Sequence, residues 1–115
     1  MTKTESLKNT QQFGRVYKKG KSRADKNLVM YVLDNEYTGR NRLGISVSKK
    51  VGNSVVRHRM CRLIREAYRL HEDMFNSGLD IVVVVRRGSD GITYHEVEDS
   101  LIHLAKVHRI LTGNP

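Results

Sequence analysis

Residues 49–69 constrain this chain more than any other segment, because they must supply both a core face and a charged surface. Wound as an α-helix from Ser54 at about 100° per residue, the segment separates into two faces. One face is polar and holds Arg57, His58, Arg59, Arg62, Arg65, Glu66 and Arg69. The opposite arc is apolar and holds Val56, Met60, Leu63, Ile64, Ala67 and Leu70. This pattern predicts an amphipathic helix that docks on a core and presents five arginines to solvent.

The charge of this segment indicates an anionic partner. The chain carries 21 Lys and Arg against 12 Asp and Glu, a formal net charge of +9. Residues 40–69 alone hold nine basic residues and one acid, a local charge of +8. A merely solvated helix face usually mixes both signs. Guanidinium groups stay charged and donate a planar fork that fits phosphate oxygens. The segment therefore predicts a polyanion-binding surface with fast, salt-sensitive association.

The rest of the composition favours one globular domain over residues 1–115. A hydrophobic fraction of 38% supports a folded core and not a disordered basic tail. The first residues lack an apolar run of signal-peptide type, and the longest apolar run, residues 81–85, is too short to span a bilayer. A lone Cys61 cannot form an internal disulfide. We therefore expect a cytoplasmic protein.

Hydrophobic periodicity and turn residues predict the secondary structure. A first helix is capped by Asn9 and ends near Gly20. Strands are expected at 28–33, 43–48 and 81–85, with a turn at 34–41 and a loop at 86–91. The basic helix ends before 76–78, and a last helix covers about 94–111.

Side-chain patterns within these elements predict how they pack. Alternation places Leu43, Ile45 and Val47 on one face of their strand. Residues 81–85 do not alternate, which is typical of a strand covered on both faces. The last helix has an inner stripe of Val97, Leu101, Leu104, His108 and Leu111. Together the elements predict an α/β fold, more narrowly an α+β two-layer sandwich in which helices cover a four-stranded sheet.

Residues 43–59, which read LGISVSKKVGNSVVRHR, resemble the signature of the protein component of bacterial ribonuclease P. In that family a strand runs into Lys-Lys-x-Gly-Asn, and the following helix carries an Arg-Asn-Arg motif. The resemblance continues at 13–20, at 29–31, at 81–87 and in the last helix, so it spans almost the full chain. Two positions depart from the family pattern. His58 stands where Asn is usual, although imidazole also donates and accepts hydrogen bonds, and Cys61 stands where Lys is common.

The resemblance implies a left-handed βαβ crossover through the basic helix, which departs from the usual right-handed rule. It implies an accessory subunit of an endoribonuclease, with catalysis by the RNA subunit and its Mg²⁺ and no catalytic residue, metal or cofactor in this chain. Its partners would be the ribonuclease P RNA and precursor tRNA, with no membrane and no obligate protein partner. The expected contacts to the RNA subunit are Lys49, Lys50, Asn53, Arg57, His58, Arg59, Arg62, Arg65 and Arg69. The 5′ leader of precursor tRNA would lie in a cleft lined by Phe13, Tyr17 and Tyr31.

Several alternatives stay open. The same surfaces suit a general or ribosome-associated RNA-binding protein without a role in tRNA 5′ maturation. A membrane-lying helix is disfavoured because the apolar arc has no Trp or Phe and the neighbouring strands would bury it. A protein-only nuclease with His58 as the base lacks a second acid or base beside it. A metal site of His58, Cys61 and His71 lacks the usual ligand spacing. Lys49 and Lys50 are also compatible with an ordinary surface position. Phe13, Tyr17 and Tyr31 are also compatible with a place in the core, and burial is expected most for Phe13.

Overall fold

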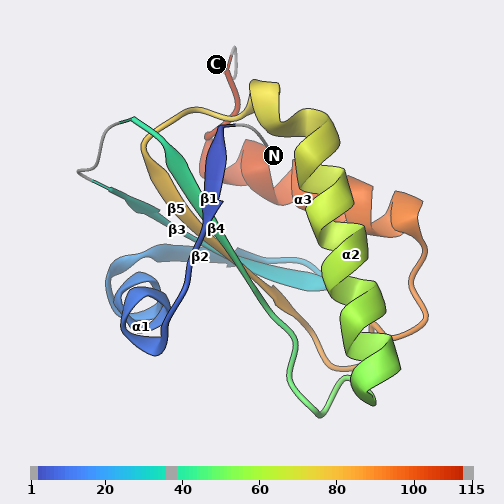
Figure 1. Ribbon diagram of the computed structural model, residues 1–115. Coiled ribbons are helices and arrows are strands. Elements are labelled where there is room, and N and C mark those ends of the chain that lie inside the picture. The colour runs from blue at the N-terminus through green and yellow to red at the C-terminus, as the bar shows by residue number, and fades with distance from the viewer. Residues whose placement is uncertain (1–2, 36–38, 113–115) are drawn as a thin grey trace.

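Five strands form one sheet in the order β1-β4-β5-β3-β2 (Figure 1). The computed structural model describes residues 3–35 and 39–112. The elements are β1 (Thr4–Ser6), α1 (Thr10–Lys19), β2 (Lys21–Ala24), β3 (Leu28–Asp34), β4 (Asn41–Ser46), α2 (Ser54–His71), the 3₁₀ turn η1 (Glu72–Met74), β5 (Leu79–Val85) and α3 (Tyr94–His108). The strand β4 pairs in parallel with β1 and β5, and β3 pairs antiparallel with β5 and β2.

Helices cover both faces of this sheet, so the fold has three layers where two were predicted. In Figure 1, α1 lies on one side of the sheet, and α2 and α3 lie on the other. The larger core joins α2 and α3 to the sheet through buried residues such as Met60, Ile64 and Leu101. The smaller core joins Val16 of α1 to Leu7 and Val82. The central strand β5 contributes to both cores, which confirms the expectation from its uniformly apolar sequence.

The sheet has five strands and not the predicted four. Three of them were located in the sequence, and the other two are short strands without a hydrophobic signal. Only one of the three residues of β1, Thr4, is buried. All four residues of β2 are exposed. Strands are recognised in a sequence by a buried face with a period of two, and neither segment has one. They form as edge strands because the chain on either side of α1 lies next to β4 and β3.

The ends of the helices follow from capping chemistry. Asn9 accepts a hydrogen bond from the backbone N–H of Gln12, and Gly20 follows the last residue of α1, as predicted. The helix α2 ends at His71 and continues as η1, so it also ends before residues 76–78. The helix α3 ends at His108 and not at Leu111, because Arg109 adopts the left-handed conformation, with φ 60°. Leu111 is still buried, in a bridge to Phe75.

The buried arc of α2 is rotated relative to the predicted one. Leu70 was placed in the core but is 54% exposed, whereas Tyr68, on the boundary of the polar face, is fully buried. Its hydroxyl shares a hydrogen bond of 2.8 Å with Thr4 Oγ1, and its ring centroid lies 4.8 Å from that of Phe75. A helical wheel treats tyrosine as neutral, but here the sheet supplies a polar partner for the phenol.

The connection from β4 through α2 to β5 is the predicted crossover, because β4 and β5 are adjacent and parallel. Its left-handed sense stays a prediction. Of the predicted turn at 34–41, residues 36–38 lie outside the described residues. The first described residue after β3, Asn35, is bound to the residue before β5, since its backbone N–H donates to the carbonyl of Gly78 at 2.8 Å.

Candidate nucleic-acid interface

The polar face of α2 and the turn that precedes it carry the predicted basic side chains. We call this surface the basic face, and it consists of Lys49, Lys50, Arg57, His58, Arg59, Arg62, Arg65 and Arg69. Lys49, Lys50, His58, Arg62, Arg65 and Arg69 are exposed, and Arg57 and Arg59 are half-buried. The structure brings Arg59, Arg62, Arg65 and Arg69 together around one hollow, and Arg57 and His58 around another.

Asn53 has a different role from the cations that were grouped with it. Its side-chain oxygen accepts a hydrogen bond of 3.0 Å from the backbone N–H of Val56, so Asn53 is the N-cap of α2. Gly52 also allows α2 to begin here, because the first turn packs against it and a Cβ at that position would lie 2.8 Å from Cβ of Val56. These two residues fix where α2 begins and hence which side chains form the basic face.

The five arginines of α2 differ in how they are held. Arg59 donates to the carbonyl of Ile92 at 2.8 Å, which ties α2 to the segment before α3. Arg69 binds Glu66 through two hydrogen bonds, of 3.1 Å and 2.5 Å. Arg62 and Arg65 make no hydrogen bond or ion pair among the described residues. These two guanidinium groups are consequently the ones most available to a phosphate.

Arg57 lies against the strand β4. It lines a hollow of about 240 Å³ with Ile45, Val47, Ser54, His58 and Cys61. Its Nε is buried and has no hydrogen-bond partner within residues 3–35 and 39–112. A buried donor without an acceptor is costly, so the packing of Arg57 on β4 leaves this nitrogen unsatisfied.

Phe13, Tyr17 and Tyr31, which were predicted to line a cleft, form an aromatic cluster on the face of the sheet opposite α2 and α3. The rings of Tyr17 and Tyr31 meet edge to face with centroids 5.0 Å apart, and those of Phe13 and Tyr17 are 6.4 Å apart. Tyr17 is 39% exposed, and Phe13 and Tyr31 are half-buried. Phe13 and Tyr31 thus pack on the smaller core, Tyr17 lies against their rings, and all three still present surface to solvent.

Gly44 lets Phe13 lie directly on the sheet. Gly44 pairs with Val82, and Val82 pairs with Tyr31, so the three residues form one row across the face that α1 covers. A Cβ on Gly44 would lie 2.6 Å from the ring of Phe13, which is closer than real contacts allow. The glycine of the predicted strand is therefore required by the position of the first aromatic ring.

The aromatic cluster and the basic face meet at the edge of the sheet. The strand β1 ends at Ser6, beside Leu43, so within the described part of the chain no strand lies next to the later residues of β4 on that side. A hollow of about 130 Å³ opens there, and we call it the β4-edge hollow. Phe13 from α1 and Arg65 from α2 both line it, with Ser6, Leu7, Leu43, Gly44, Ile45 and Cys61. The two surfaces predicted from sequence are thus neighbours around one strand edge.

A second hollow on α2 includes a residue that sequence reasoning missed. It has a volume of about 560 Å³ and is lined by Arg59, Arg62, Leu63, Arg65, Glu66, Arg69 and Tyr94. We call it the Tyr94 pocket. Tyr94 is the first residue of α3, and its hydroxyl donates to Glu98 at 3.3 Å. Nothing in the spacing of residues 94–108 distinguishes this tyrosine, because its place beside α2 depends on how the two helices pack.

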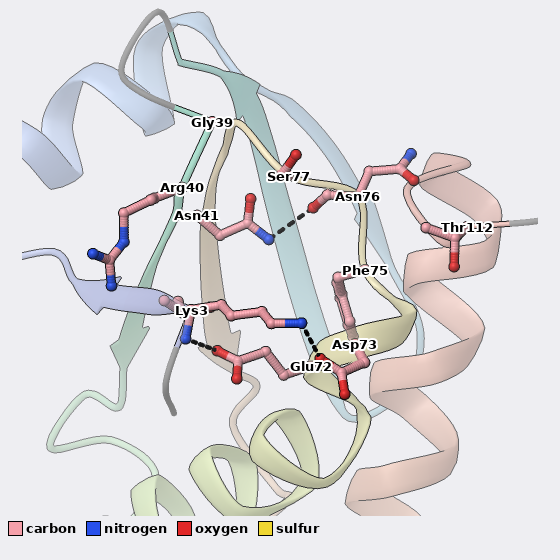
Figure 2. Close-up of a pocket in the computed structure, with 11 residues that line it drawn as sticks. Lys3, Gly39, Arg40, Asn41, Glu72, Asp73, Phe75, Asn76, Ser77 and Thr112 are labelled. Atoms are coloured by element: carbon pink, nitrogen blue, oxygen red, sulfur yellow. Dashed lines mark hydrogen bonds and ion pairs between the residues drawn. The ribbon is translucent and has the colours of Figure 1, made fainter.

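A larger hollow of about 670 Å³ lies away from both surfaces, where β1, β4 and η1 come together (Figure 2). Its polar groups already bind one another. Lys3 donates through Nζ to Asp73 at 2.8 Å and through its backbone N–H to Glu72 at 3.3 Å, and Asn41 donates to the carbonyl of Asn76 at 2.8 Å. These contacts fasten β1 to η1, so the hollow has a structural role.

Of the three side chains considered for metal binding, His58 and Cys61 line one hollow and His71 lies apart from them. His71 at the end of α2 binds Glu98 at 2.8 Å, about three and a half helical turns from His58. Burial raises the pKa of the Cys61 thiol, which keeps it protonated. Within residues 3–35 and 39–112, no three His, Cys, Asp or Glu side chains gather as metal ligands would. Over the same residues, no helix is both long and apolar enough to cross a membrane.

Comparisons with known proteins identify the family. A family model described as Ribonuclease P matches residues 1–109. The ribonuclease P protein component of Lachnoclostridium phytofermentans is 65% identical over 111 residues, which cover 96% of this chain and 95% of that protein. The protein component of Alkaliphilus metalliredigens is 44% identical over 114 residues, or 97% of this chain and all of that protein.

Solved structures agree with these sequence matches. The RNase P protein of Staphylococcus aureus superposes with a TM-score of 0.86 at 36% identity, over 93% of this chain and 97% of that one. The RNase P protein of Thermotoga maritima superposes with a TM-score of 0.79 at 29% identity, over 87% and 94%. Because sequence and fold agree over nearly the whole length, the chain belongs to the ribonuclease P family and is an accessory protein component of that endoribonuclease.

Proposed function

We propose that this chain binds the catalytic RNA of ribonuclease P through the basic face and the 5′ leader of precursor tRNA through the aromatic cluster. It thereby promotes removal of the leader and formation of the mature tRNA 5′ end. Arginine and lysine side chains position phosphates without reading sequence. Aromatic rings stack on the bases of a single strand at about 1–3 kcal/mol per base. The reaction itself belongs to the RNA subunit and its Mg²⁺, and the protein contributes affinity.

The observation that carries this proposal is the meeting of the two surfaces at the β4-edge hollow, where Phe13 and Arg65 line one space. A protein that binds any structured RNA needs only the basic face. A protein that prefers precursor to mature tRNA needs a second surface for the leader. This surface has to lie close enough to the basic face for the leader to bind while the basic face holds RNA. The proximity of the aromatic cluster to Arg65 supports this second arrangement.

Three further expectations belong to the same proposal. His58 is exposed on the basic face and takes the place of the family asparagine as a hydrogen-bonding contact to RNA. The crossover through α2, which the adjacent parallel strands β4 and β5 require, is left-handed, as the family resemblance implies. The location is cytoplasmic, where the RNA substrate is made and processed.

The test is cleavage of a precursor tRNA by a bacterial ribonuclease P RNA at low Mg²⁺, with and without this chain. We expect a large gain in formation of the mature 5′ end, and no cleavage by the protein alone. Affinities for precursor and mature tRNA, measured with the assembled holoenzyme, separate this proposal from general RNA binding. Equal affinities, together with no gain in cleavage, would favour the general RNA-binding protein.

A further inference from the structure

The Tyr94 pocket combines side chains that recognise a nucleotide in three different ways. Tyr94 supplies an aromatic ring, Arg62 and Arg65 supply free guanidinium groups, and Glu66 supplies a carboxylate. Neighbouring positions three residues apart on a helix lie about 5–6 Å apart, so Arg62 and Arg65 can contact the same phosphate. At about 560 Å³ the pocket has room for one nucleotide.

The ring of Tyr94 is held in place before any ligand binds. Its hydroxyl donates to Oε2 of Glu98. This carboxylate oxygen also lies 2.8 Å from Nε2 of His71 on α2. The tyrosine is therefore fixed between the two helices, with its ring against the arginine side of α2. A fixed aromatic ring stacks on a base at a lower entropic cost than a mobile one.

Glu66 is an unusual residue for a surface that binds a polyanion. It is the single acid in residues 40–69, and it remains ionised, because the hydrogen bond from Arg69 lowers its pKa. Its carboxylate accepts two hydrogen bonds from Arg69, but an ionised carboxylate offers about four acceptor positions. Two positions are thus left for a ligand, and Arg69 orients them.

A carboxylate with two free acceptor positions matches one base better than the others. On its Watson–Crick edge guanine carries two adjacent donors, N1–H and the N2 amino group, whereas adenine, cytosine and uracil do not. Unpaired bases in RNA are read on that edge while they stack on aromatic side chains. We propose that the Tyr94 pocket binds one unpaired guanine nucleotide, with the base stacked on Tyr94, its donor edge on Glu66 and its phosphate on Arg62 and Arg65.

This inference rests on the proposed function, because the guanosine would belong to the RNA that the basic face holds. It adds base selectivity to a surface that otherwise contacts only phosphates. It also gives Glu66 a role: a negative charge that weakens non-specific binding to RNA is retained because it selects one base.

The test compares short uridine-rich single strands that differ at one central nucleotide: guanosine, inosine or adenosine. Inosine keeps N1–H and lacks the N2 amino group, so it removes one of the two proposed donors. With the intact chain we expect guanosine to bind about tenfold more tightly than adenosine, with inosine between them. Equal affinities for all three strands would overturn the proposal.

Three variants assign the selectivity to the pocket. Glu66→Gln removes a negative charge, so every strand should bind slightly more tightly while the preference for guanosine disappears. Tyr94→Phe should keep the preference, and Tyr94→Ala should weaken binding of guanosine and adenosine strands alike. Asp99→Asn is the matched control, because it removes an exposed negative charge of α3 outside the pocket lining and should leave the preference unchanged. Circular dichroism verifies that each variant is folded.

Two further experiments distinguish a free guanine nucleotide from a guanosine of the RNA subunit. Free guanosine monophosphate should compete weakly, since most of the phosphate contacts made by RNA are missing. In the holoenzyme, Glu66→Gln should alter which guanosine of the RNA subunit is protected from chemical modification. If selectivity is absent but the chain still stimulates precursor cleavage, the pocket inference is wrong and the proposed function stands. If the chain prefers guanosine but does not stimulate precursor cleavage, the pocket binds guanosine and the proposed function is wrong.

Discussion

Arg42 of β4 binds Asp80 of β5 through two hydrogen bonds, from Nε to Oδ1 at 2.8 Å and from Nη2 to Oδ2 at 2.6 Å. Asp80 is fully buried, and Asn35 donates a further hydrogen bond of 3.0 Å to it. Arg15 of α1 lies 3.9 Å from the same carboxylate. One buried charge thus links β4, β5 and α1, the three elements that position the aromatic cluster relative to the basic face.

We predict that Asp80→Asn lowers the free energy of unfolding by about 3–5 kcal/mol, since it leaves the mostly buried Arg42 without its counter-charge. Chemical denaturation measures the change. The matched control is Asp73→Asn, which breaks the exposed pair with Lys3 and should have little effect on stability. Similar losses in the two variants would mean that the Arg42–Asp80 pair is no more important than a surface contact.

The same pair predicts how stability depends on pH. Burial alone would raise the pKa of Asp80, but the hydrogen bonds from Arg42 and Asn35 outweigh it and hold the pKa below the ordinary value. A lowered carboxyl pKa stabilises the fold fully above the unfolded-state value of about 3.9, and this stabilisation is lost as the pH falls through the folded-state pKa. Unfolding measured from neutral to acidic pH should therefore show a loss that is smaller in Asp80→Asn. A variant that loses as much stability in acid as the intact chain would contradict this account.

The sequence predicts α2, its polar face and the three long strands, because α2 and residues 43–48 are periodic and the other two strands are continuous apolar runs. It fails where a residue depends on a partner that is distant in the sequence. Tyr68 is buried because Thr4 of β1 meets its hydroxyl, and β1 itself is invisible because only Thr4 is buried. Tyr94 joins the surface of α2 only through the packing of α3. Local periodicity contains no information about such pairs.

The arginines of α2 should separate into two classes on mutation. Arg62→Ala removes a guanidinium that makes no hydrogen bond or ion pair within the described residues, so affinity for the RNA subunit should fall and the slope of its salt dependence should decrease by about one. Stability should not change. Arg59→Ala also releases the carbonyl of Ile92, so it should lower stability as well as RNA affinity. Filter binding at several salt concentrations, paired with thermal unfolding, measures both. Identical effects of the two substitutions would contradict the distinction.

Tyr17 is the best position to test the proposed leader site, because it is 39% exposed and its loss should leave the core intact. We expect Tyr17→Ala to weaken binding of precursor tRNA to the holoenzyme about tenfold, with little change for mature tRNA. Tyr17→Phe retains the ring, so its affinity for precursor tRNA should stay close to that of the intact chain. Equal losses for precursor and mature tRNA would assign Tyr17 to general RNA binding.

Gly44→Ala tests whether the close contact between the sheet and Phe13 shapes the leader site. The added Cβ would lie 2.6 Å from Cζ of Phe13 and 2.9 Å from Cδ1 of Leu7. Because β4 is held between β1 and β5, the ring of Phe13 has to move and the strand does not. We expect a loss of about 1–3 kcal/mol in stability, and weaker binding of precursor but not of mature tRNA.

Adding Phe13→Leu to Gly44→Ala makes room for the new Cβ and should restore part of the lost stability. It should not restore leader binding, because the aromatic ring is gone. A double-mutant cycle of unfolding free energies, with precursor affinities measured alongside, separates the two effects. Strictly additive losses of stability would show that the ring of Phe13 is not in contact with β4. Restored leader binding would show that Phe13 acts by filling space and not by stacking on a base.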